Sequence, residues 1–112
     1  MAKKLTNQEL KKIIDNFLVN LQGKIEIEDS LLFGSYAKGT ASEDSDIDLL
    51  IISKELPQNK PKGANGFYLT KLAGFENIYP GLEVIGIHPE KLKHPITKSF
   101  FDEILETAKS YK

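Results

Sequence analysis

Two acidic residues stand at the start of an otherwise apolar segment of the sequence. Asp46 and Asp48 open the segment 46–53, whose other residues are mostly Leu and Ile. Side chains at positions i and i+2 of a β-strand point to the same face, so we expect the two carboxylates to converge. Close carboxylates repel each other unless a cation lies between them. Hard oxygen ligands of this kind suit Mg²⁺ together with substrate phosphates, and the spacing therefore predicts a magnesium site.

A glycine and a serine precede the acidic pair. Gly34 and Ser35 directly follow the apolar end of the segment 29–33, and ten residues separate Ser35 from Asp46. Glycine allows the backbone to approach an anion closely, and a serine hydroxyl with its backbone N–H suits a phosphate oxygen. Lys38 adds a positive charge three residues later. Phosphate binding beside a metal is the combination that phosphoryl and nucleotidyl transfer require.

Glu83 is a candidate third carboxylate. It is the only acidic residue in the apolar segment 82–87, where Leu82 and Val84 flank it. Such a residue could hold a second metal or accept the proton of an attacking hydroxyl group. The alternative is an ordinary acidic side chain that faces water on an edge strand.

The surrounding sequence indicates the elements that position these residues. Thr6 and Glu9 predict a capping box for a helix that Gly23 ends, and His88 with Pro89 predicts a short helical turn. We expect strands over 29–33, 46–53 and 82–87, a connection over 34–45 and a surface loop over 54–66. Further expectations are a short helix over 67–74, a turn over 79–81 and a last helix over 98–110. The order predicts an α/β (α+β) fold with a small mixed sheet of three to four strands and helices packed on one face.

Composition limits the class of protein. With 112 residues and 40% hydrophobic content, the chain is expected to form a single domain over residues 1–112. The net charge is −1 and all 15 basic residues are lysine, which makes a nucleic-acid partner an unfavoured interpretation. We find no cysteine, no signal-peptide pattern and no apolar run long enough to span a membrane. These features predict a soluble cytoplasmic protein.

The stretch 32–39 together with 45–49 resembles the DNA polymerase β-type nucleotidyltransferase superfamily, and within it the minimal nucleotidyltransferases of bacteria and archaea. Their pattern is Gly-Ser, ten residues and Asp-x-Asp, and the segment 82–85 also resembles their third-carboxylate strand. The resemblance implies a nucleotidyltransferase fold and Mg²⁺-dependent transfer of a nucleoside monophosphate from an NTP, with AMP from ATP as the expected case and pyrophosphate released. It implies catalytic and metal-binding roles for Asp46, Asp48 and Glu83, and nucleotide binding by Gly34, Ser35 and Lys38.

The same resemblance implies a partner protein. Many such small proteins accompany a helical partner with an RNase-like motif, in what resembles a toxin–antitoxin pair, and some transfer AMP to a tyrosine of that partner. The small size of the chain favours a partner, or a second copy in a homo-oligomer, that completes the substrate pocket. The alternative is a non-catalytic partner-binding antitoxin or nucleotide-sensing module with a vestigial site.

Overall fold

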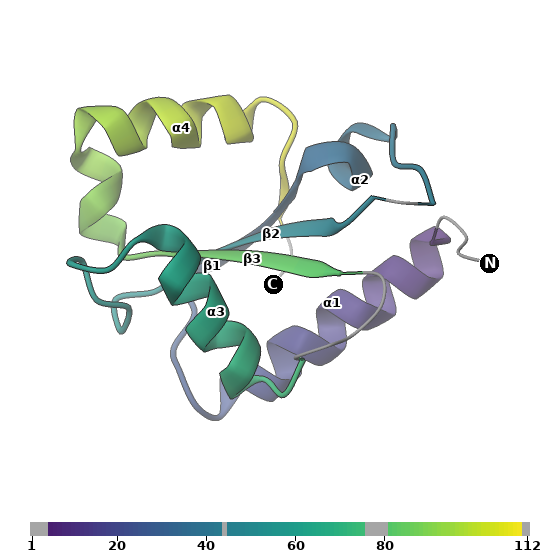
Figure 1. The fold of residues 1–112 in the computed structure, drawn as a ribbon, viewed down its shortest axis with the longest axis horizontal. Coiled ribbons are helices and arrows are strands. Elements are labelled where there is room, and N and C mark those ends of the chain that lie inside the picture. Colours follow the sequence, from purple (N-terminus) through teal and green to yellow (C-terminus); the bar gives the residue numbers. More distant parts are fainter. Residues whose placement is uncertain (1–4, 44, 76–80, 111–112) are drawn as a thin grey trace.

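The computed structural model describes residues 5–43, 45–75 and 81–110, and it has helices on both sides of a central sheet (Figure 1). The elements are α1 (Asn7–Gln22), β1 (Asp29–Phe33), α2 (Gly34–Lys38), β2 (Ile47–Ile52), α3 (Lys62–Leu72), β3 (Leu82–Ile87), the 3₁₀ helix η1 (Pro89–Lys93), α4 (Pro95–Leu105) and β4 (Lys109–Ser110). Within the described residues, four strands form one sheet in the order β3-β2-β1-β4. β1 is antiparallel to β2 and to β4, whereas β2 and β3 are parallel. The predicted α/β class and the mixed sheet of three to four strands are confirmed.

The first helix forms as the sequence predicts. The Thr6 side chain accepts a hydrogen bond from the Glu9 backbone N–H, and the Glu9 side chain accepts one from the Thr6 backbone N–H. This reciprocal pair satisfies two donors that the first turn of a helix leaves without partners. Gly23 is the C-cap residue. The buried face of α1 consists of Leu10, Ile14, Phe17, Leu18 and Leu21.

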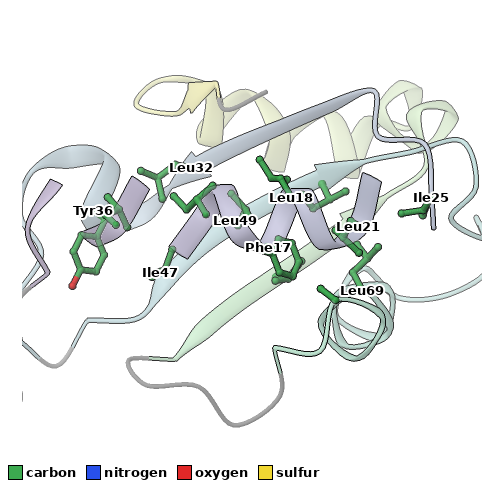
Figure 2. Close-up of a cluster of buried hydrophobic side chains, with 14 of the residues drawn as sticks. Phe17, Leu18, Leu21, Ile25, Leu32, Tyr36, Ile47, Leu49 and Leu69 are labelled. Atoms are coloured by element: carbon green, nitrogen blue, oxygen red, sulfur yellow. The ribbon is translucent and has the colours of Figure 1, made fainter. Parts of the chain in front are cut away.

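Both faces of the sheet are covered, which corrects the expectation of helices on one face only. Strand β2 is apolar on both faces because Leu49 and Ile51 belong to one core cluster, while Leu50 and Ile52 belong to another. The first cluster joins the sheet to α1 and α3, and Figure 2 shows Phe17 and Leu21 in it together with Leu49 and Leu69. The second cluster lies under α4, which crosses the opposite face in Figure 1.

Helix α3 begins inside the segment that we expected to be a surface loop. The helix spans Lys62–Leu72 instead of 67–74, although Gly63, Asn65 and Gly66 are poor helix formers. Packing overrides propensity here, because Gly66 lies against the Val84 backbone, where a Cβ atom would have no room. The buried Asn65 amide donates to the carbonyl oxygens of Pro57 and Gly86, at 3.2 and 3.1 Å. These contacts fix α3 onto β3.

The remaining differences concern element boundaries. The expected connection over 34–45 contains the short helix α2, and β2 begins at Ile47, so Asp46 lies just before the strand. Strands β1 and β3 and the His88–Pro89 helix start agree with expectation. The last helix spans 95–105 rather than 98–110, Leu105 is exposed on it, and residues 109–110 instead form β4. The expected turn over 79–81 lies outside the described residues, except for Gly81.

Candidate active site

Gly34 turns the chain from β1 directly into α2. Its φ is +72°, a left-handed conformation that side chains with a Cβ rarely adopt. A Cβ atom at this position would also collide with the carboxylate of Asp48. Two independent constraints therefore demand glycine at position 34, and one of them is the close approach of an acidic side chain.

Helix α2 is held in place by two buried side chains and one hydrogen bond. Tyr36 and Ala37 are buried, and the Tyr36 hydroxyl oxygen, seen at the left of Figure 2, accepts a 3.3 Å hydrogen bond from the Leu5 backbone N–H. Ser35 is half-buried and Lys38 is exposed, so both remain accessible from solvent. Among the residues that the structure describes, no side chain caps the start of α2, where Phe33 is the N-cap residue. The first backbone N–H groups of the helix are therefore available to an anion.

Asp48 and Glu83 are neighbours across the parallel pair of strands. They are direct register partners in β2 and β3, and their side chains are hydrogen-bonded to each other. Asp48 is half-buried, whereas Glu83 is exposed. Two carboxylates can share a hydrogen bond only when one of them carries a proton, and this contact is one of the causes that raise the pKa of Asp48. The sequence alone did not show this pairing, because it depends on the register between two distant strands.

Asp46 lies at the edge of this pair. It is exposed, and a Cβ atom at Gly81 would come within 2.6 Å of its Oδ1 atom. The neighbouring Ile47 N–H donates a 2.9 Å hydrogen bond to the Gly81 carbonyl oxygen. Asp46 is thus held beside the residue that leads into β3, the strand that carries Glu83.

The three carboxylates act on one another electrostatically. Burial raises the pKa of Asp48 from 3.8 to about 6, and the charge of Glu83, the hydrogen bond with Glu83 and the charge of Asp46 act in the same direction. A group of like charges that resists ionisation is the environment in which a bound cation is most favourable. The oxygen donors of this group fit Mg²⁺ in chemical type.

The three carboxylates do not surround a common point at which a metal ion would be fully coordinated. Across residues 5–43, 45–75 and 81–110, no group of three or more His, Cys, Asp or Glu side chains is arranged to hold a metal ion. The arrangement is instead a hydrogen-bonded pair, Asp48 and Glu83, with Asp46 beside it. Mg²⁺ commonly keeps several water molecules and takes only one or two carboxylates from the protein, so an open arrangement suits it.

A cavity that the sequence analysis did not anticipate lies next to Gly34. Its volume is about 220 Å³, and it lies between α2 and α4 on the same side of the sheet as Leu50 and Ile52. The lining residues are Phe33, Gly34, Lys38, Phe100, Glu103, Ile104 and Thr107. The spacing of the last four residues, i, i+3, i+4 and i+7, is the signal that could have indicated one shared helix face.

A small mixed sheet with a Gly-Ser turn after one strand and carboxylates on the next two defines a nucleotidyltransferase type of fold. The family model described as "Nucleotidyltransferase domain" matches residues 9–109. The chain belongs to this family.

Several relatives match most of the chain. "Putative protein adenylyltransferase MJ0141" of Methanocaldococcus jannaschii is 36% identical over 97 residues, which are 87% of this chain and 86% of that protein. "Protein adenylyltransferase MntA" of Thermococcus cleftensis is 28% identical and covers 90% of this chain and 95% of its own length. A further protein of M. jannaschii is 47% identical over 53 residues, but the match spans only 36% of that protein.

Solved structures share the fold at low sequence identity. A crystal structure of a nucleotidyltransferase from Sulfolobus solfataricus, itself described as putative, has a TM-score of 0.63 at 16% identity and covers 91% of this chain and 78% of that one. A toxin–antitoxin structure with AMP-PNP has a TM-score of 0.54 at 18% identity and covers 86% of this chain and 69% of that one. In the part of this chain that the structure describes, no helix is long and apolar enough to cross a membrane.

Proposed function

We propose that the protein is a Mg²⁺-dependent protein adenylyltransferase, which transfers AMP from ATP to a hydroxyl group of a partner protein and releases pyrophosphate. The observation that carries the proposal is the contact of Gly34 with the Asp48 carboxylate, which itself is paired with Glu83. This contact joins a backbone turn suited to phosphate and an acidic pair suited to a divalent cation within one site.

The chain supplies two kinds of contact to the nucleotide. The uncapped start of α2 offers backbone N–H groups to the phosphates, and the Ser35 hydroxyl and Lys38 ammonium add a donor and a positive charge. Asp46 and Asp48 would hold Mg²⁺, with Glu83 as the third carboxylate. When bound, the metal would neutralise phosphate charge and favour departure of pyrophosphate.

The transfer reaction also requires a group that accepts a proton. The acceptor oxygen forms a bond to the α-phosphorus, and the bond from that phosphorus to the bridging oxygen of pyrophosphate breaks. The acceptor hydroxyl loses its proton during this exchange. Glu83 is exposed and lies beside Asp48, and this position supports a role for its carboxylate as the acceptor of that proton.

The relatives support the nature of the acceptor. One relative carries the name protein adenylyltransferase MntA, and one crystal structure with the same fold is that of a toxin–antitoxin pair, MntA with HpeT. Another structure with this fold is described as a tri-AMPylated HEPN toxin of Shewanella oneidensis in complex with an MNT antitoxin. We propose the same kind of acceptor here, a small helical partner protein.

The test is transfer of labelled AMP. Purified protein is incubated with ATP labelled at the α-phosphate, with Mg²⁺ and with the candidate partner, and intact-mass spectrometry counts the AMP groups on the partner. Wild type should label the partner, and Asp48→Asn should reduce the rate at least a hundredfold. Asp15→Asn is the matched control, because Asp15 is a partly exposed acid on α1 that pairs with Lys11 at 2.6 Å.

The same experiment tests the non-catalytic alternative. If the partner binds wild type and Asp48→Asn equally and neither protein transfers AMP or requires Mg²⁺, the chain acts as a binding antitoxin with a vestigial site. Such a result would overturn the proposed activity.

A further inference from the structure

The cavity between α2 and α4 contains polar side chains, and the proposed chemistry uses only one of them, Lys38. Glu103 and Thr107 line it from the α4 side, and Lys38 lines it from α2. Within the described residues, neither Lys38 nor Glu103 takes part in an ion pair. Gly34 also lines the cavity, so it opens beside the turn at which we place the phosphates. The cavity could therefore hold the part of the same ligand that is covalently attached to those phosphates.

The cavity suits a neutral group with polar donors better than it suits phosphate. Phe33, Phe100 and Ile104 form apolar walls, and the Glu103 carboxylate would repel a polyanion. The Lys62 ammonium at the start of α3 lies over the Phe100 ring, 4.8 Å from its centroid. The volume of about 220 Å³ is below the range of about 300–1,000 Å³ that holds a whole drug-sized ligand. It therefore matches one part of a nucleotide.

Ribose is the part of a nucleotide that fits this description. It is directly bonded to the α-phosphate, it is uncharged, and its 2′ and 3′ hydroxyl groups are hydrogen-bond donors. A carboxylate accepts hydrogen bonds from such hydroxyl groups, as acidic residues do in dinucleotide-binding folds. The apolar walls would then contact the sugar carbons and the adjoining edge of the base.

We propose that the cavity between α2 and α4 binds the ribose of the nucleotide and that Glu103 makes the site selective for ribonucleotides over 2′-deoxyribonucleotides. The inference rests on the proposed nucleotide-binding function and specifies which sugar that site takes. Glu103 acts here as a specificity-determining residue, separate from the carboxylates on β2 and β3.

The experiment measures equilibrium binding rather than turnover. Dissociation constants of the full chain for ATP, 2′-deoxy-ATP and 3′-deoxy-ATP are determined by calorimetry in Mg²⁺, for wild type, Glu103→Gln and Glu103→Ala. Glu106→Gln is the matched control, since Glu106 is an exposed acid at the end of the same helix and does not line the cavity. Glu103 is also exposed, so these substitutions leave the core intact.

We expect wild type and Glu106→Gln to bind ATP about tenfold more tightly than 2′-deoxy-ATP, the effect of one hydrogen bond to a charged group. Glu103→Ala should remove this preference by weakening the binding of ATP and of 3′-deoxy-ATP, which both carry the 2′ hydroxyl, while the binding of 2′-deoxy-ATP stays unchanged. An unchanged ATP preference in Glu103→Ala, or equal weakening for all three nucleotides, would overturn the inference while the proposed function stands. If wild type binds no triphosphate, both proposals fail together.

Discussion

The α-carbon of Gly34 lies against the carboxylate of Asp48, so closely that a side chain at position 34 would occupy the place of that carboxylate. The turn that we assign to phosphate and the acid that we assign to the metal are therefore in direct contact. Adding a side chain at position 34 must therefore displace the Asp48 carboxylate.

Substitution of Gly34 should consequently affect activity more than stability. In Gly34→Ala the positive φ costs about 1–2 kcal/mol of folding free energy, and Asp48 must also move away. Gly39 is the matched control, because its φ is +77° and no atom lies within 4 Å of an added Cβ. We expect similar losses in urea unfolding for both variants, but at least a hundredfold slower AMP transfer only for Gly34→Ala. Equal transfer rates in the two variants would contradict the importance of the contact.

The raised pKa of Asp48 predicts how the stability of the metal-free protein depends on pH. The folded pKa is about 6 and the ordinary value is 3.8, so the folded state binds a proton more tightly than the unfolded state. This contribution is fully present below about pH 4 and is lost as the pH rises through 6. Because Asp48 is only half-buried, we expect a loss of about 1 kcal/mol, less than the full shift would give.

Urea unfolding in chelator between pH 4 and pH 7.5 measures this effect as the difference between wild type and Asp48→Asn. As the pH rises over that range, the free energy of unfolding of wild type should fall relative to that of Asp48→Asn. Asp15→Asn serves again as the control and should follow wild type. Parallel curves for wild type and Asp48→Asn would show that Asp48 titrates normally.

Addition of Mg²⁺ should restore the stability that wild type loses at neutral pH when Asp48 ionises. A cation that binds only the folded state raises the free energy of unfolding in proportion to the logarithm of its concentration above the Kd. We expect millimolar Mg²⁺ at pH 7.5 to raise the melting temperature of wild type but not that of Asp48→Asn. An equal shift in both proteins would indicate non-specific binding elsewhere.

Glu83→Gln isolates the effect of the neighbouring charge. Removing the negative charge opposite Asp48 should bring the pKa of Asp48 down towards its ordinary value, because the Glu83 charge is one of the causes that raise it. A ¹³C NMR titration of the aspartate carboxyl groups follows this change directly. AMP transfer should fall at least tenfold, since the proposed proton acceptor is lost. An unchanged Asp48 titration would show that the two side chains do not interact in solution.

The close packing of α3 on β3 gives a prediction about stability alone. Gly66→Ala places a methyl group against the Val84 backbone, which cannot easily yield, and should cost about 2–3 kcal/mol. Gly63→Ala in the same helix meets no atom within 4 Å and should be neutral or stabilising by up to about 1 kcal/mol. Chemical denaturation of both variants measures the difference. Similar values for the two would mean that the helix does not approach the strand so closely.

The elements with strong local signals could be predicted from the sequence. The Thr6–Glu9 capping box and the apolar strands have signals that lie within a few residues, and the structure has them where they were expected. The start of α3 could not be predicted in this way, because Gly63 and Gly66 favour a loop locally. The contact that makes Gly66 acceptable in a helix comes from Val84, a residue of another element.

In the candidate site, too, some features could be predicted from local sequence and others depend on contacts between distant segments. The types and spacing of Gly34, Ser35, Asp46 and Asp48 indicated the chemistry, while their roles in catalysis stay predictions. The pairing of Asp48 with Glu83 follows from the parallel register of β2 and β3, and the cavity follows from the crossing of α4 over the sheet. Neither relation is encoded within a single segment of the chain.

Gly34 directly follows β1, Asp48 lies on β2 and Glu83 lies on β3, and this placement has a consequence for folding. Gly34, Asp48 and Glu83 come together only when β1 has paired with one edge of β2 and β3 has paired with the other edge, across the intervening helix α3. Parallel pairing of this kind is non-local and closes late in folding compared with a helix or a hairpin. Partly folded chains, including nascent ones, would therefore lack the proposed catalytic centre, and the proposed activity would appear only once the sheet is complete.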